Sequence, residues 1–219
     1  SNSGYRQIYI APATFSGVDS DNVVIEDCTV SWAALADSSI SAQPAISVTN
    51  NGASLFTNVS VKNNTIIQHS DNVIDSGSAM CIEAAGASGL LIEGNKCTNG
   101  LLSISWFNCD GFAVNGNVIK TGGDIGIECA NRNINGTVTA NSINGIGTLD
   151  DGISVNGVLG VCDNIVISGN PIGGVVNGIS MFGQSLADRH TNITAANNNI
   201  ICVGSGKPIK CQWVDGLSI

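Results

Sequence analysis

A nine-residue pattern recurs along the 219-residue chain and constrains its fold more than any other feature of the sequence. One copy, NIVISGNPI, begins at Asn164, and close variants begin at Asn22, Asn58, Gly89 and Gly111. Apolar residues lie five and three positions before a central Asn or Cys, and another lies two positions after it. Side chains spaced by two along a strand point to the same face. The pattern therefore predicts a short β-strand, a turn and the start of a second strand.

Seven copies fit one alignment. Their central residues are Cys28, Asn64, Asn95, Asn117, Asn141, Asn170 and Asn198, and the residues three positions earlier, predicted to be buried, are Ile25, Val61, Ile92, Val114, Val138, Ile167 and Ala195. A second strand signal, two apolar residues separated by one, lies between the copies at Ile46/Val48, Met80/Ile82, Leu102/Ile104, Ile125/Ile127, Ile153/Val155, Ile179/Met181 and Ile209/Cys211. Successive copies lie 22 to 36 residues apart, which is enough for one turn of a solenoid built from two or three short strands.

Coils of strands with inward Ile and Val, each turned by an Asn, resemble the right-handed β-helices of the pectate-lyase-like class. The resemblance implies an all-β fold: a single-stranded right-handed parallel β-helix solenoid of about 7–8 coils, with stacked side-chain amides forming an Asn ladder. We expect one β-helix domain over residues 1–219, as a fragment of a longer chain. A leucine-rich repeat is not expected, because that solenoid needs a regular period and Leu at fixed positions.

Charge and cysteine usage exclude several classes of function. The net charge of −9 and a pI near 4.3 provide no basic patch for nucleic acid, and no apolar run reaches the roughly 20 residues of a membrane span. The eight cysteines lack paired spacing, so we predict free, mostly buried thiols. No Cys or His cluster has zinc-binding spacing, and we expect neither a metal nor another cofactor.

Two glutamates are the first candidates for catalysis. Aligning the chain on the second strand signal places the next residues in one outward column: Thr49, Glu83, Ser105, Glu128, Asn156, Phe182 and Gln212. Glu83 and Glu128 would then lie two coils, or roughly 10 Å, apart. Inverting glycosidases hold their acid and base at about 6.5–9.5 Å. The residues within each pair, nearly all of them small, would form an open floor: Ser47, Cys81, Ser103, Gly126, Ser154, Ser180 and Lys210. A solvated pair of surface glutamates is the alternative.

Neighbouring residues suggest how a sugar would bind. Trp106, Phe182 and Trp213 offer flat apolar faces on which sugar rings stack, and Ser105 and Asn156 offer polar partners for hydroxyl groups.

A second acidic set, Asp124, Asp150 and Asp151, precedes two of the apolar pairs. The stretches LDDGISVNG, VNGISMFG and KPIK resemble the Asp pair, Gly-His-Gly turn and Arg-Ile-Lys motif of polygalacturonases, although Asn177 takes the place of the His and Lys207 that of the Arg. The resemblance implies that the three aspartates form an acid and base set. Asp and Gly are also common where a turn enters a strand, so a structural role remains open.

Among β-helix families, the short polar turns, free cysteines and open carboxylate face resemble phage tailspikes and related tail appendages most. This resemblance implies an extracellular or virion-tail protein that binds and hydrolyses a bacterial surface polysaccharide, with Glu83 and Glu128 as acid and base and Asp124 and Asp151 as the alternative site. It also implies a homotrimer, for which the outward column with Val24, Leu91, Ala113 and Val166 is a candidate interface. The rival hypothesis is a non-catalytic structural or glycan-binding module of a tail fibre or adhesin. A lyase would need a basic residue at the floor, which only Lys210 and Arg132 approach.

Overall fold

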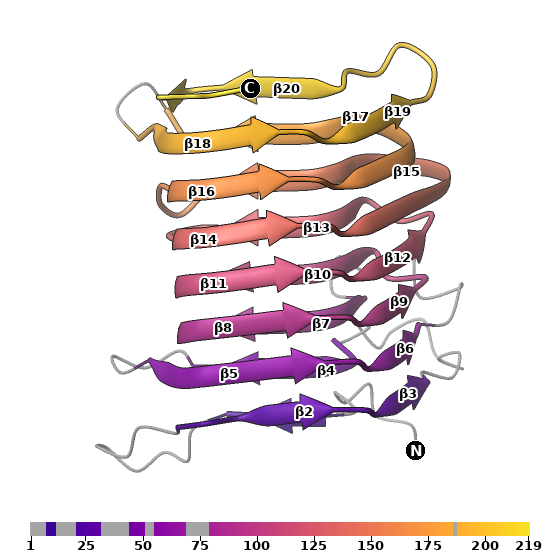
Figure 1. The fold of residues 1–219 in the computed structure, drawn as a ribbon, viewed down its shortest axis with the longest axis vertical. Helices are drawn as coiled ribbons and strands as arrows, with labels where there is room; N and C mark the ends of the chain where they lie inside the picture. Colours follow the sequence, from indigo (N-terminus) through magenta and orange to yellow (C-terminus); the bar gives the residue numbers. More distant parts are fainter. Residues whose placement is uncertain (1–7, 12–20, 32–43, 51–54, 69–78, 186–187) are drawn as a thin grey trace, which may run out of the picture.

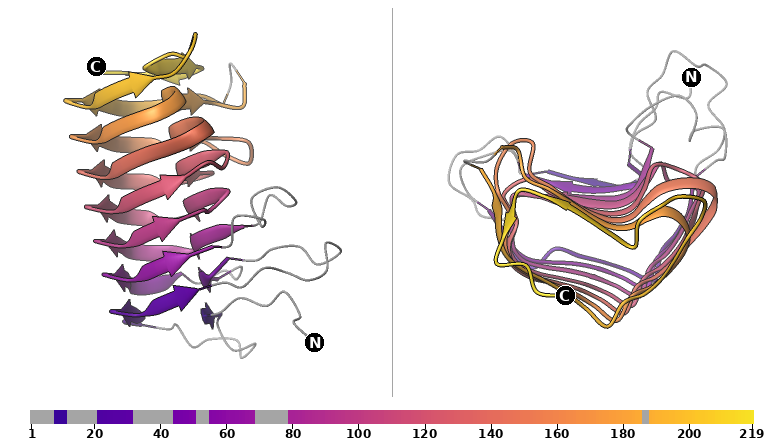
Figure 2. Two further views of the ribbon diagram at one scale, coloured as in Figure 1. Left: turned by 90° about the vertical axis from the view of Figure 1, so that its right-hand side faces the viewer. Right: turned by 90° about the horizontal axis from the view of Figure 1, so that it is seen from above.

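The computed structural model describes residues 8–11, 21–31, 44–50, 55–68, 79–185 and 188–219, and every regular element in these ranges is a β-strand. The strands pair in parallel, each with the equivalent strand one turn earlier and one turn later. They stack from β2 and β3 at one end to β20 at the other (Figure 1). Viewed along the stack, successive turns trace the same outline around one interior (Figure 2). The arrangement is all-β and solenoid-like, and it is consistent with a parallel β-helix.

Two curled sheets make up the wall. The 8-stranded sheet has the order β2 (Val24–Glu26), β5 (Phe56–Lys62), β8 (Ala87–Glu93), β11 (Asp110–Asn115), β14 (Ile134–Thr139), β16 (Asp163–Ser168), β18 (His190–Ala196) and β21 (Val214–Asp215). The 13-stranded sheet contains two rows. One row has β1 (Ile8–Ile10), β4 (Ile46–Thr49), β7 (Met80–Ala85), β10 (Leu102–Phe107), β13 (Ile125–Ala130) and β20 (Ile209–Gln212). The other has β3 (Thr29–Ser31), β6 (Thr65–Ile67), β9 (Lys96–Thr98), β12 (Val118–Thr121) and β19 (Asn199–Cys202). The long strands β15 (Ser142–Asn156) and β17 (Pro171–Phe182) belong to both rows.

The predicted buried column of the 8-stranded sheet is confirmed. Its members lie side by side in the strand register and are all buried: Ile25, Val61, Ile92, Val114, Val138, Ile167 and Ala195. This row of branched side chains removes a continuous apolar surface from water along the stack. Within the described residues, no helix is long and apolar enough to span a membrane.

Two corner positions explain why the repeat is rich in Asn and Gly. The first residue of the repeat has a positive φ in every turn: Asn22, Asn58, Gly89, Gly111, Asn135, Asn164, Asn192 and Gly216. The residue before the central Asn or Cys does too: Asp27, Asn63, Gly94, Gly116, Ala140, Gly169 and Asn197. Glycine adopts this left-handed conformation without strain, and Asn and Asp tolerate it better than other residues. The two bends of each turn therefore explain why Asn, Asp and Gly recur at these two positions. Ala140 is the exception.

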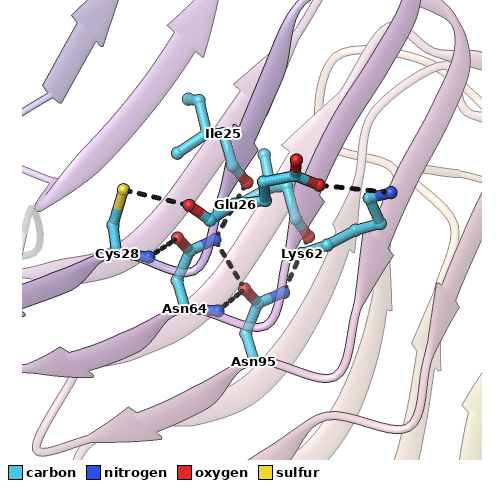
Figure 3. Close-up of polar contacts among 7 residues, drawn as sticks. Ile25, Glu26, Cys28, Lys62, Asn64 and Asn95 are labelled. Carbon is cyan, nitrogen blue, oxygen red and sulfur yellow. Dashed lines mark hydrogen bonds and ion pairs between the residues drawn. The ribbon is translucent and has the colours of Figure 1, made fainter.

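The central asparagines hydrogen-bond to one another through the interior (Figure 3). Asn95 Oδ1 accepts hydrogen bonds from the backbone N–H and from the Nδ2 of Asn64, both at 2.9 Å, and Asn64 Oδ1 accepts one from the backbone N–H of Cys28 at 3.0 Å. The same double hydrogen bond recurs onward through Asn117, Asn141, Asn170 and Asn198. These bonds satisfy polar groups that the turn would otherwise leave unpaired in the core.

Candidate functional site

Glu83, Ser105 and Glu128 lie side by side on adjacent strands. Strand pairing aligns Ser105 of β10 with Glu83 of β7 on one side and with Glu128 of β13 on the other. Each follows a fully buried isoleucine, so the three side chains point out of the wall. The prediction that these residues share one outward column, with one turn between the two glutamates, is confirmed.

The rest of that column was predicted wrongly. Strand pairing places Ser47, Ser154, Ser180 and Lys210 beside the two glutamates, in place of Thr49, Asn156, Phe182 and Gln212. The predicted alignment paired Ile46 with Met80, whereas the structure pairs Ile46 with Ile82. The register of β7, β10 and β13 relative to the other strands of this row is therefore shifted by two residues from the prediction. Cys81, Ser103 and Gly126, which were predicted to form part of an open floor, are buried. The serines of the column are buried as well, since Ser47 and Ser180 are 0% exposed and Ser105 and Ser154 are 3% exposed. The accessible part of this column therefore comes from Glu83, Glu128 and Lys210.

Each glutamate is held by a serine of the preceding turn. Ser47 Oγ donates to Glu83 Oε2 at 2.7 Å, and Ser105 Oγ donates to Glu128 Oε2 at 2.7 Å. Partial burial raises the pKa of the Glu128 carboxyl, the hydrogen bonds from Ser105 and Asn156 lower it, and the charge of Asp124 raises it further. The net direction is upward, so Glu128 keeps its proton to a higher pH than an ordinary glutamate does.

The aspartates that sequence analysis treated as a separate site adjoin Glu128. Partial burial raises the pKa of Asp124, and the carboxylates of Asp150 and Asp151 raise it further. Asp151 Oδ1 accepts hydrogen bonds from Ser180 Oγ at 2.8 Å and from Asn177 Nδ2 at 2.9 Å. Because Asp124 acts electrostatically on Glu128 as well as on the aspartates, we treat Asp124, Glu128, Asp150 and Asp151 as one acidic cluster.

No family model matches the chain, and no curated protein or solved structure matches it either. The chemistry of the acidic cluster must therefore be argued from its own geometry.

Aromatic residues contribute less to this face than sequence analysis predicted. Trp106 is 0% exposed and packs against Phe112 in the core, with ring centroids 5.2 Å apart, so the prediction that its ring stacks on a sugar is wrong. Phe182 is half-buried, and Lys210 Nζ lies 4.9 Å above its ring centroid. Phe182 pairs in register with Asn156, one column away from the serines and glutamates. Trp213, also half-buried, follows β20 at a bend with positive φ.

Packing explains the glycines of the polygalacturonase-like stretch. A Cβ at Gly152 would lie 2.5 Å from Ile172 Cγ2 and 2.7 Å from the Gly178 carbonyl oxygen, and a Cβ at Gly178 would lie 2.3 Å from Ile200 Cγ2. None of these three distances is tolerable for a side-chain carbon. The two glycines thus form a tight seam between the rows of the 13-stranded sheet, and their presence needs no catalytic reason.

The structure adds partners that sequence analysis did not identify. Ser47, Ser180 and Asn177 each donate to a carboxylate of a neighbouring turn, and the signal for the serines was their recurrence in the same strand position. In the part of the chain that the structure describes, no group of three or more His, Cys, Asp or Glu side chains is placed to hold a metal ion.

Proposed function

We propose that the chain forms a right-handed parallel β-helix of about seven to eight coils with an asparagine ladder, and that it binds and hydrolyses a bacterial surface polysaccharide. The setting we propose is a virion tail or the extracellular space, as for the phage tailspikes that the sequence resembles. One observation carries the proposal: two outward glutamates flank Ser105 on adjacent strands, and the pKa of one of them is raised. A carboxylic acid that stays protonated beside a carboxylate is the arrangement that glycoside hydrolysis requires.

In the proposed reaction Glu128 is the general acid and Glu83 the general base. Glu128 donates its proton to the glycosidic oxygen as the bond to the anomeric carbon breaks. Glu83 takes a proton from the water whose oxygen attacks that carbon from the opposite face. Two turns of about 4.8 Å leave room for this water, which favours inversion of the anomeric configuration. Asp124 and Asp151 form the alternative pair, with Asp124 as the acid because its pKa is also raised.

Incubation with purified capsular and O-antigen polysaccharides, followed by measurement of reducing ends, tests the proposal. Glu83→Gln and Glu128→Gln should each lower cleavage by at least 100-fold, because each removes a proton-transfer group but keeps the side-chain shape. Glu93→Gln is the matched control, since Glu93 is a half-buried glutamate on the other sheet. Loss of cleavage only in Asp124→Asn or Asp151→Asn would transfer the catalytic roles to the aspartates. Unchanged cleavage in all four variants would exclude the acidic cluster as the site.

A non-catalytic glycan-binding or structural module is the second candidate. The observation that favours it is that Glu83, Glu128 and Asp151 each accept a hydrogen bond from a serine of a neighbouring turn, as a purely structural role would require. If no polysaccharide is cleaved but Phe182→Ala weakens retention of a glycan, this candidate is supported.

We also propose that the chain assembles as a homotrimer through the outer face of the 8-stranded sheet. Val24, Leu91, Ala113 and Val166 share one outward column there, and Val24 and Val166 are 54% and 37% exposed. Light scattering at micromolar concentration should give the mass of three chains, and Val166→Asp should reduce it to that of one. Val118→Asp, which changes an exposed valine of the other sheet, should leave the trimer intact. A monomeric parent protein would contradict the proposal.

A further inference from the structure

Two buried cysteines of consecutive turns lie together near one corner of the wall. Cys129 is an inward residue of β13, and Cys162 directly precedes β16. Both are 0% exposed and both are free thiols. The proposed hydrolytic function uses neither of them.

The Cys162 thiol lies next to the backbone of Cys129. Cys162 Sγ lies 4.0 Å from the carbonyl oxygen of Cys129, and Asn133 Nδ2 donates to Cys129 Sγ at 3.4 Å. Asn133 itself is fixed, because its Nδ2 also donates to the carbonyl oxygens of Trp106 and Ala130. Each thiol shifts the pKa of the other.

His190 sets the environment of Cys162 from the following turn. The backbone N–H of Cys162 donates to His190 Nδ1 at 2.9 Å, and His190 Nε2 lies 2.9 Å from the carbonyl oxygen of Phe182. Because Nδ1 is an acceptor, Nε2 carries the proton and donates it to Phe182. Both ring nitrogens are thus engaged and the buried imidazole has one orientation.

The two thiols differ in acidity. The pKa of Cys162 is lowered to about 5, first by its interaction with Cys129 and further by the backbone of Asn133, although burial opposes this. Burial and the interaction with Cys162 raise the pKa of Cys129. A thiolate beside a protonated thiol is the starting arrangement for thiol–disulfide exchange.

We propose that Cys129 and Cys162 are a disulfide-forming pair, oxidised by a small disulfide such as oxidised glutathione while the turns assemble. The Cys162 thiolate attacks one sulfur of glutathione disulfide, forming a mixed disulfide and releasing one glutathione thiolate. Cys129 then loses its proton and attacks the Cys162 sulfur, releasing the second glutathione. Two protein thiols are oxidised to one disulfide, and one glutathione disulfide is reduced to two glutathione thiols that carry the two protons.

The bond would tie consecutive turns together. It would close a loop from residue 129 to residue 162 and restrict the unfolded chain, which favours the folded state. Its burial would also shield it from reductants once the turns have closed.

A second pair of buried thiols provides an internal comparison. Cys81 of β7 and Cys97 of β9 are both buried, and the interaction with Cys81 and burial raise the pKa of Cys97. A thiol with a raised pKa is a poor nucleophile at neutral pH. Exchange should therefore favour the Cys129 and Cys162 pair.

Refolding of the full chain in a glutathione redox buffer tests the inference. After alkylation of free thiols in denaturant, trypsin cuts after Lys96, Lys120 and Arg132. It places Cys81, Cys129 and Cys162 on three different peptides and leaves Cys97 and Cys109 together on peptide 97–120. Mass spectrometry should find peptides 121–132 and 133–189 joined, with a mass two hydrogens below the sum of the reduced peptides. Cys81 and Cys97 should be alkylated. The unfolding midpoint should rise by on the order of 5 to 10 °C, and dithiothreitol added in denaturant should abolish the rise.

Cys109→Ser should retain the link, since Cys109 is the third thiol of this corner, whereas Cys129→Ser should remove both the link and the increase in midpoint. The inference is wrong if refolded protein with native circular dichroism carries alkyl groups on both Cys129 and Cys162, or if Cys162 is joined to Cys109. Protein secreted into an oxidising bacterial periplasm should show the same link, which provides a second test that needs no refolding.

Discussion

Asn117 Oδ1 accepts two hydrogen bonds from Asn95, one from the backbone N–H at 2.9 Å and one from Nδ2 at 3.0 Å. Asn117 Nδ2 in turn donates to the Ile92 carbonyl oxygen at 3.0 Å and to Asn141 Oδ1 at 2.9 Å. Both asparagines are 0% exposed, so water cannot replace these partners. One side chain therefore satisfies polar groups of three consecutive turns.

Replacing Asn117 with Ala should lower the free energy of unfolding by about 2 to 4 kcal/mol, because it removes the Oδ1 acceptor of two buried Asn95 N–H groups and one donor to the buried Ile92 carbonyl. Asn115→Ala is the control, since Asn115 is a half-exposed residue of the outward column next to Glu93. Its effect should stay within about 0.5 kcal/mol. Urea denaturation of both variants measures the difference, and equal effects would mean that the interior amides do not carry this stability.

Ile92→Ala should cost about 2 to 5 kcal/mol, because it opens a cavity in a fully buried column. Leu91, the adjacent residue of β8, points outward and is half-buried, so Leu91→Ala should cost clearly less. The two midpoints of chemical denaturation provide the test. If Leu91→Ala lowered the stability more than Ile92→Ala does, the outer face of β8 would be more deeply buried than its inner face, contrary to this prediction.

Residues that repeat with the turns were predictable from the sequence. Alternation at Ile92 and its equivalents identified the inward face, because a strand whose register shifts by one residue would expose its whole apolar set. The same alternation placed Glu83, Ser105 and Glu128 in one column, since all three follow equivalent isoleucines. It also contained the signal that Trp106, directly after outward Ser105, points inward.

Features that depend on the neighbouring turn were not predictable. A register shift by two residues keeps every apolar side chain inside, so hydrophobicity alone did not reveal that Ile82, and not Met80, pairs with Ile46. The hydrogen bond of Ser180 to Asp151 and the electrostatic interaction of Asp124 with Glu128 follow from that register and from the path of β15. Because the loops between the turns differ in length, the spacing of residues along the sequence does not reveal which residues pair.

Gly126→Ala should destabilise the protein by about 1 to 3 kcal/mol. The new Cβ would lie 2.6 Å from the Gly152 carbonyl oxygen and 2.9 Å from Ile143 Cγ2, in the seam between the rows of the larger sheet. Gly173→Ala is the matched control, because a Cβ there meets nothing within 4 Å and neither glycine has a positive φ. That variant should be neutral or slightly more stable, since Ala restricts the unfolded chain. Thermal unfolding in which Gly126→Ala is the more stable of the two would contradict the packing of the seam.

The raised pKa of Glu128 predicts how stability depends on pH. Because the folded state holds this proton more tightly than the unfolded state does, the contribution of Glu128 to stability is most favourable below its ordinary pKa of 4.5, and it falls as the pH rises through the raised value. Gln cannot ionise, so Glu128→Gln should raise the melting temperature relative to the parent more at pH 7 than at pH 3.5. An equal change at both pH values would show that Glu128 ionises without a penalty.

The substitution Asp124→Asn separates two causes of the raised pKa of Glu128, its burial and the charge of Asp124. Burial of Glu128 is unchanged by the substitution, but the negative charge that raises its pKa further is removed. In the Asp124→Asn background, the gain from Glu128→Gln at pH 7 should therefore be smaller than in the parent, though still above zero because burial remains the larger cause. Melting temperatures of the four proteins in this double-mutant cycle measure the coupling. Strict additivity would mean that Asp124 and Glu128 do not interact, and the acidic cluster would then separate into two independent sites.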